Sequence, residues 1–215
     1  EAAETPVRRG WYALALINTA VVGEIVLYLA YRFTRDHKLA AFIMIPWAML
    51  ALGAAMIALP WKLWRPFATT DRSAKFVRAG FAWLGISMLL LLLLPVYQKI
   101  SGMAFSHAYY GAIRHAVTVG FVSLMIMGFA AKVVPTLNGI DPRTLTALWL
   151  PFVLVNVGCF LRVSLQTLTD FHPAFFSYVG ISGVLEVTGL GIWGVGLARI
   201  MLAGRTEAVA AGPRP

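Results

Sequence analysis

Long apolar runs separated by short polar stretches are the dominant pattern along this 215-residue chain. Each run approaches or exceeds the roughly 20 residues that an α-helix needs to cross a bilayer. Only helices satisfy their own backbone hydrogen bonds in lipid without closing into a barrel, and these runs are too long for barrel strands. The pattern predicts an all-α integral membrane protein, a bundle of six transmembrane helices near residues 11–33, 39–60, 77–97, 106–135, 143–166 and 173–202.

The chain shows no internal repeat, low-complexity tract or linker, so residues 1–215 are predicted to form a single six-helix membrane domain. Pro60, Pro135 and Pro142 fall at predicted helix ends, where proline is tolerated. Pro46 and Pro151 fall inside predicted spans, close to one end of each.

Composition excludes a water-soluble domain of this size. Hydrophobic residues make up 60% of the chain, charged residues 13%, and the mean hydropathy is +0.77. Soluble domains carry about 25% charged residues. The net charge of +9 comes from basic residues that flank the spans, where they meet anionic lipid. Since no basic helix or aromatic-interleaved basic patch exists, nucleic acid is excluded as a partner.

The distribution of basic residues predicts the orientation. Twelve of the 18 Lys and Arg residues fall in the N-terminus, the loops after the second and fourth spans, and the C-terminus, whereas four fall in the opposite loops. Because cytoplasmic loops carry the excess of basic residues, both termini are predicted to be cytoplasmic. The predicted localisation is a bacterial inner (cell) membrane, crossed several times.

Ionisable residues inside a membrane are costly and usually functional. Five of them lie more than three residues from either end of a predicted span, and the predicted orientation places all four histidines in the outer half of the protein. His107 opens the fourth span, and His115 lies eight residues deeper, about 12 Å along a helix. The intramembrane ionisable residues are Glu24, Arg114, His115, Arg162 and Glu186.

This asymmetry predicts a haem site near the outer face. Imidazole ligates haem iron, copper and zinc, so His115 is the candidate axial ligand. His107 or His172 is the candidate second ligand or copper ligand. Arg114 and Arg162 would bind the haem propionates, because a guanidinium group matches a carboxylate in a bidentate pair.

Structural roles account for the same residues without a cofactor. His115 could form a hydrogen bond between helices, His107 could be an interfacial residue, and His172 could begin a helix before Pro173. Glu24 and Glu186 could form ion pairs with the two intramembrane arginines. Cys159 is the only cysteine, so no disulfide framework or thiolate zinc site is expected, and a metal would be held by histidine, methionine, carboxylate or haem.

Residues 115–139 follow the pattern H-x4-GF-x6-GF-x4-VP-x3-G, from His115 through Pro135 to Gly139. This pattern resembles a signature of the NnrS family of haem- and copper-containing membrane proteins. Members of that family have about twelve spans, so this chain has about half their length, and Ile113 stands where they have a further histidine. By position, the resemblance implies a metal-centre role for His115 only.

The resemblance implies a protein that binds haem b, and possibly copper, in nitric oxide or respiratory redox metabolism and electron transport. Its partners would be membrane lipid, other membrane subunits or a periplasmic electron-transfer protein. One alternative is a cofactor-free membrane subunit or anchor of a larger respiratory complex. Another is a small transporter or quinone-binding protein that uses Glu24 and Glu186. Whether the chain is an enzyme is left open.

Overall fold

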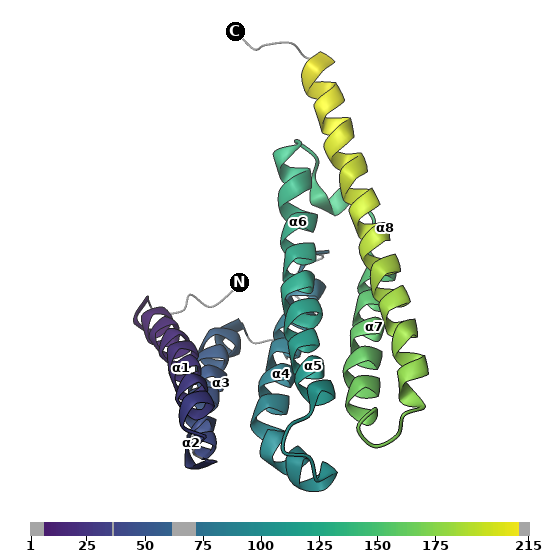
Figure 1. The fold of residues 1–215 in the computed structure, drawn as a ribbon. Coiled ribbons are helices and arrows are strands. Elements are labelled where there is room, and N and C mark those ends of the chain that lie inside the picture. The colour runs from purple at the N-terminus through teal and green to yellow at the C-terminus, as the bar shows by residue number, and fades with distance from the viewer. Residues whose placement is uncertain (1–6, 36, 62–71, 211–215) are drawn as a thin grey trace. The chain divides into compact units, whose positions relative to one another are not determined.

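The computed structural model describes residues 7–35, 37–61 and 72–210, and within this part every regular element is a helix (Figure 1). The elements are α1 (Val7–Thr34), α2 (His37–Phe42), α3 (Met44–Ala58), η1 (Leu59–Trp61), α4 (Ala74–Ser101), α5 (His107–His115), η2 (Ala116–Ser123), α6 (Leu124–Leu137), η3 (Pro142–Thr144), α7 (Trp149–Leu168) and α8 (Phe175–Ala210).

Among the described residues, five helices are long and apolar enough to cross a membrane: Val7–Thr34, Ala74–Ser101, His107–Leu137, Trp149–Leu168 and Phe175–Ala203. Many of their large apolar side chains are exposed. This is expected of helices that face lipid, because the bilayer core is itself apolar. The all-helical prediction is confirmed, and the five helices are consistent with a multi-pass membrane protein.

The predicted second span, residues 39–60, is divided in the structure. The helix breaks at Ile43, between α2 and α3, and α3 is a 15-residue apolar helix. Pro46 explains the break, because it has no N–H group to donate to the carbonyl of Phe42 and its ring crowds that carbonyl. Trp47, the next residue, donates to Ile43 over a long 3.4 Å. Residues 39–60 therefore form two helical segments.

The chain divides into two compact units, residues 1–65 with 84–105 and residues 66–83 with 106–215. In the first unit, α1 packs against α3. Gly53 permits this approach, because a Cβ there would lie 2.7 Å from Ile17. The buried Trp47 donates its indole N–H to Glu24 at 3.1 Å. This bond satisfies a polar group that would otherwise be buried without an acceptor.

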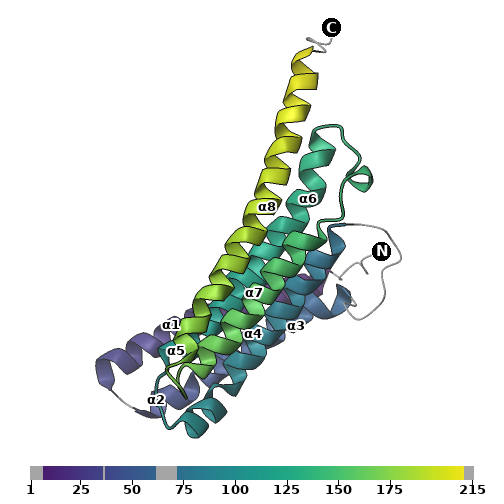
Figure 2. The same ribbon diagram turned by 90° about the vertical axis from the view of Figure 1, so that its right-hand side faces the viewer.

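In the second unit, α5, η2 and α6 form one continuous rod, and α7 and α8 form an antiparallel pair beside it (Figures 1 and 2). Aromatic and small side chains fill the interior. Phe76 packs edge-on against Phe152 with ring centroids 5.2 Å apart. Trp83 donates its indole N–H to Asn156 at 3.0 Å, and η2 approaches Trp83 closely at Gly120. These contacts fix α7 against η2 and the first half of α4.

α7 begins at Trp149, six residues later than the predicted span start at 143. The intervening residues form the short helix η3 and a turn, in which Leu148 has a left-handed φ of 56°. Pro151 lies in the first turn of α7, where a missing backbone N–H costs nothing. Pro135 lies in the last turn of α6, as predicted for a helix end.

Candidate metal centre

His115 occupies a junction between two kinds of helix. It is the last residue of α5, which begins after Ser106, whose hydroxyl accepts the N–H of Tyr109 at 2.8 Å. The next eight residues form the π-helix η2. Two side chains bond carbonyls there: Thr118 donates to Arg114 at 2.9 Å, and Ser123 donates to Thr118 at 3.1 Å. π-helical segments are rare and often accompany functional sites.

Cys159 and Glu186 reach His115 from the α7–α8 pair. The two helices are very close at Gly158, where a Cβ would lie 2.6 Å from Glu186 Cγ and 2.9 Å from the Ser182 carbonyl oxygen. Only glycine fits at that position. The glutamate side chain therefore crosses the backbone of α7 beside Cys159.

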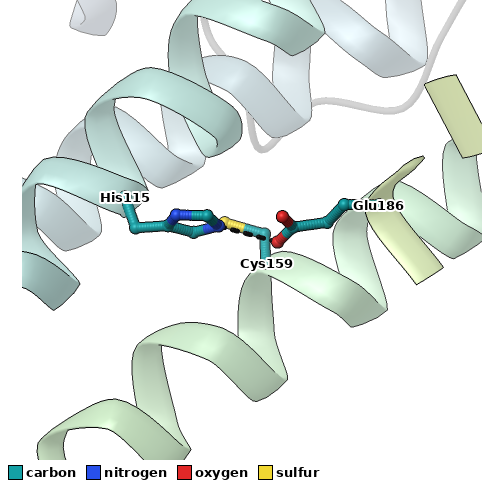
Figure 3. Close-up of side chains that lie close together, drawn as sticks. All are labelled: His115, Cys159 and Glu186. Atoms are coloured by element: carbon teal, nitrogen blue, oxygen red, sulfur yellow. Dashed lines mark hydrogen bonds and ion pairs between the residues drawn. The ribbon is translucent and has the colours of Figure 1, made fainter. Parts of the chain in front are cut away.

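The three side chains converge at one point (Figure 3). His115 Nε2 lies 2.7 Å from Glu186 Oε1, and one ligand atom from each of His115, Cys159 and Glu186 lies within 4.8 Å of the others. Cys159 is fully buried, and the His115 and Glu186 side chains are 19% and 9% exposed. The cluster is thus enclosed by α5, α7 and α8.

The three side chains offer one imidazole, one thiol and one carboxylate, a set of ligand types that can hold a metal ion. Donor atoms bound at 2.0–2.3 Å to a tetrahedral ion lie about 3.3–3.6 Å apart. The His115–Glu186 separation of 2.7 Å is shorter than that range and all three ligand atoms lie within 4.8 Å of one another, so small side-chain rotations would bring them to one ion. A neutral imidazole, a thiolate and a carboxylate together carry two negative charges, which a divalent cation neutralises inside a low-dielectric bilayer.

The other residues singled out in the sequence lie elsewhere. His107 begins α5, and both it and Arg114 are exposed. His172 is exposed in the turn before α8, where its Nδ1 accepts the N–H of Ala174 at 3.1 Å. Arg162 is half-buried on α7, and its Nε has no hydrogen-bond partner among the described residues. Glu24 belongs to the other unit, where it accepts from Trp47.

Cys159 is the residue of the cluster that sequence reasoning missed. The interpretation that one cysteine excludes a thiolate ligand is too broad, because a mixed site needs only one. A signal was present, since Cys159 lies three residues before Arg162 and so shares a helix face with an intramembrane ionisable residue. For Glu186 the sequence predicts an ion pair with an intramembrane arginine or a place in a transporter or quinone site, and in the structure its carboxylate lies 2.7 Å from His115 Nε2.

Comparison with protein families places these residues within one domain model, which matches residues 5–199 and so includes all three side chains of the cluster. The chain belongs to the family described as Domain of unknown function (DUF8744). Neither the curated proteins nor the solved structures contain a match to this DUF8744 chain. The resemblance of residues 115–139 to the NnrS family stays a prediction.

Proposed function

We propose that this chain is a multi-pass membrane protein that binds one divalent transition-metal ion through His115 Nε2, Cys159 Sγ and the Glu186 carboxylate. The observation that supports the proposal is the convergence of three metal-ligand types within 4.8 Å inside apolar helices. Burying ionisable groups there is costly unless they pair or coordinate a metal. A bound ion would remove that cost for all three groups at once.

The ligand set favours a borderline-soft ion, with Zn²⁺ as the first choice and copper as the second. Zinc accepts imidazole, thiolate and carboxylate ligands together, and imidazole and thiolate also suit copper. Three protein ligands leave one tetrahedral position open, as in catalytic zinc centres. Water or a small substrate would occupy that position, so the site is proposed to perform chemistry or exchange its ligand.

Metal analysis of the purified full chain tests this proposal. Protein is purified in detergent without chelators, and its metal content is measured by inductively coupled plasma mass spectrometry. We expect about one metal ion per chain. His115→Ala, Cys159→Ser and Glu186→Gln are each expected to lose most of it, because the removal of one ligand from three leaves too few. His107→Ala, an exposed histidine outside the cluster, is the matched control and should keep the ion. Equal metal content in all five proteins would refute the site.

Haem is a second candidate cofactor, supported by the signature around His115 and by one further observation. The buried Nε of Arg162 has no hydrogen-bond partner among the described residues. Such a donor could bind a haem propionate. In this hypothesis the chain serves nitric oxide or respiratory redox metabolism, and His115 would ligate the haem iron through Nε2. A reduced-minus-oxidised visible spectrum decides it: a b-type signal that His115→Ala removes supports haem, and its absence from haem-replete protein opposes it.

We also propose that residues 39–60 complete a sixth span and that both termini are cytoplasmic, in a bacterial inner membrane. α2 and α3 together cover most of this range, and the break between them lies near one end. The excess of basic residues around the termini and the loops after the second and fourth spans supports the orientation.

A further inference from the structure

A small cavity lies in the second unit, away from the three-ligand cluster. It has a volume of about 160 Å³ and is enclosed by α6, the segment before α7, and the C-terminal half of α8. That volume is about five times the ~30 Å³ that one water molecule occupies in the liquid. The cavity is therefore large enough for a compact polar group.

The polar side chains in its wall are mainly hydrogen-bond donors. Arg72 supplies a guanidinium group and Trp193 an indole N–H, neither of which can accept, while Thr146 supplies a hydroxyl group. No acidic side chain is among the described residues that line the cavity. Trp193 Nε1 is buried and has no hydrogen-bond partner within the described part of the chain. A buried donor without an acceptor is costly, so an acceptor beside this lining residue would lower the energy.

The N-terminus of α7 also favours a negatively charged group in the cavity. Leu148 is its N-cap residue and lines the cavity, and it provides no side-chain hydrogen bond to the first turn. Leu148 also holds a left-handed φ of 56°, a conformation that is strained for a branched apolar residue. The Lys75 side chain stabilises this turn by donating a hydrogen bond to the carbonyl oxygen of Ala147. The positive end of the α7 dipole thus lies at the cavity.

We propose that this cavity binds a phosphate group, with the Trp193 indole donating a hydrogen bond to it and Arg72 supplying the opposite charge. The helix N-terminus and the arginine favour an anion, and the indole N–H needs a hydrogen-bond acceptor, so an anionic acceptor would satisfy all three. The predicted orientation places the cavity towards the cytoplasmic leaflet, where anionic lipids are concentrated. The phosphate of an anionic lipid headgroup and free inorganic phosphate share this chemistry.

Native mass spectrometry of the full chain in neutral detergent, titrated with phosphatidylglycerol, tests the proposal. Trp193→Phe keeps the ring and removes only the donor, so it should weaken binding roughly tenfold, the effect expected for a hydrogen bond to a charged group. Trp11→Phe, at an exposed tryptophan of α1, is the matched control and should bind as the parent does. Equal affinity in Trp193→Phe and the parent, or equal binding of phosphatidylcholine, would overturn the proposal.

A second variant blocks the cavity itself. A Cβ at Gly196, which lines the cavity, would meet no atom within 4 Å, so Gly196→Leu should fit, fill the space and abolish binding. Unchanged phosphatidylglycerol binding in a folded Gly196→Leu protein would count against the site.

Competition with inorganic phosphate distinguishes a lipid headgroup from free phosphate as the natural ligand. If it displaces the lipid and its own binding weakens in Trp193→Phe, the site recognises phosphate alone. If only the lipid binds and is sensitive to the substitution, the acyl chains contribute and the site is a lipid site.

Discussion

His115 Nε2 lies 2.7 Å from Glu186 Oε1, although the two residues are 71 positions apart in the chain. When Glu186 is ionised, its carboxylate can only accept, and the imidazole then donates this hydrogen bond through an Nε2 proton. Binding of a metal at Nε2 requires that proton to leave. The contact thus holds the imidazole next to its proposed co-ligand, and it makes metal uptake a proton-releasing step.

Gly158 is predicted to be essential for the approach of α7 to α8. A Cβ there would lie under 3.0 Å from Glu186 Cγ and the Ser182 carbonyl oxygen, and the second of these is backbone. Gly158→Ala should therefore lower the free energy of unfolding by about 1–3 kcal/mol, the usual cost of overpacking, and should weaken metal binding. Reversible unfolding in mixed detergent micelles measures the first effect.

Gly183→Ala on α8 is the matched control, because a Cβ there meets nothing within 4 Å. It should be neutral or stabilising by up to about 1 kcal/mol, since alanine is the better helix former. Equal stability of the two alanine variants would contradict the close packing at Gly158.

Glu24 is predicted to act as a hydrogen-bond acceptor for Trp47, which is 2% exposed. Glu24→Leu leaves the buried indole N–H without its acceptor and should cost about 1–3 kcal/mol of unfolding free energy. Glu24→Gln keeps a side-chain carbonyl oxygen and should cost less than half as much. If glutamine is as damaging as leucine in the same unfolding assay, the negative charge matters and the acceptor role is wrong.

The long apolar helices of this protein are predictable from sequence because hydropathy and length suffice to find them. The predicted range 11–33 lies within α1, and 106–135 matches the rod from α5 to α6 to within two residues. The break at Ile43 was less predictable, because a proline such as Pro46 near the end of a span can either kink the helix or be accommodated without a kink.

The candidate site was only partly predictable. The cost of burying His115 and Glu186 in lipid predicts a functional role for each, but their contact depends on how each helix is rotated about its axis. Helices that are apolar all round carry little information about that rotation. Cys159 behaves as a small apolar residue, so beyond its position one turn before Arg162 it is singled out by its place beside His115 and Glu186 in the fold. The π-helix has no sequence signal that we recognise.

The number of spans determines whether the two termini lie on the same side of the membrane. Six spans place both termini on the same side of the membrane, whereas five place them on opposite sides. Green fluorescent protein fused to either terminus should fluoresce in the cytoplasm. Alkaline phosphatase inserted after Gly102, in an open turn with a φ of 70°, should be active outside. Termini on opposite sides would show that residues 39–60 do not cross the membrane.

The most direct test of the metal centre is titration of metal-free protein with Co²⁺, which replaces zinc and reports its ligands by absorption. The parent should develop a thiolate-to-cobalt charge-transfer band that saturates near one ion per chain and is displaced by Zn²⁺. Cys159→Ser should bind without that band, and His115→Ala and Glu186→Gln should bind much more weakly. A parent protein that is folded and metal-free yet shows no such band would contradict a centre formed by His115, Cys159 and Glu186.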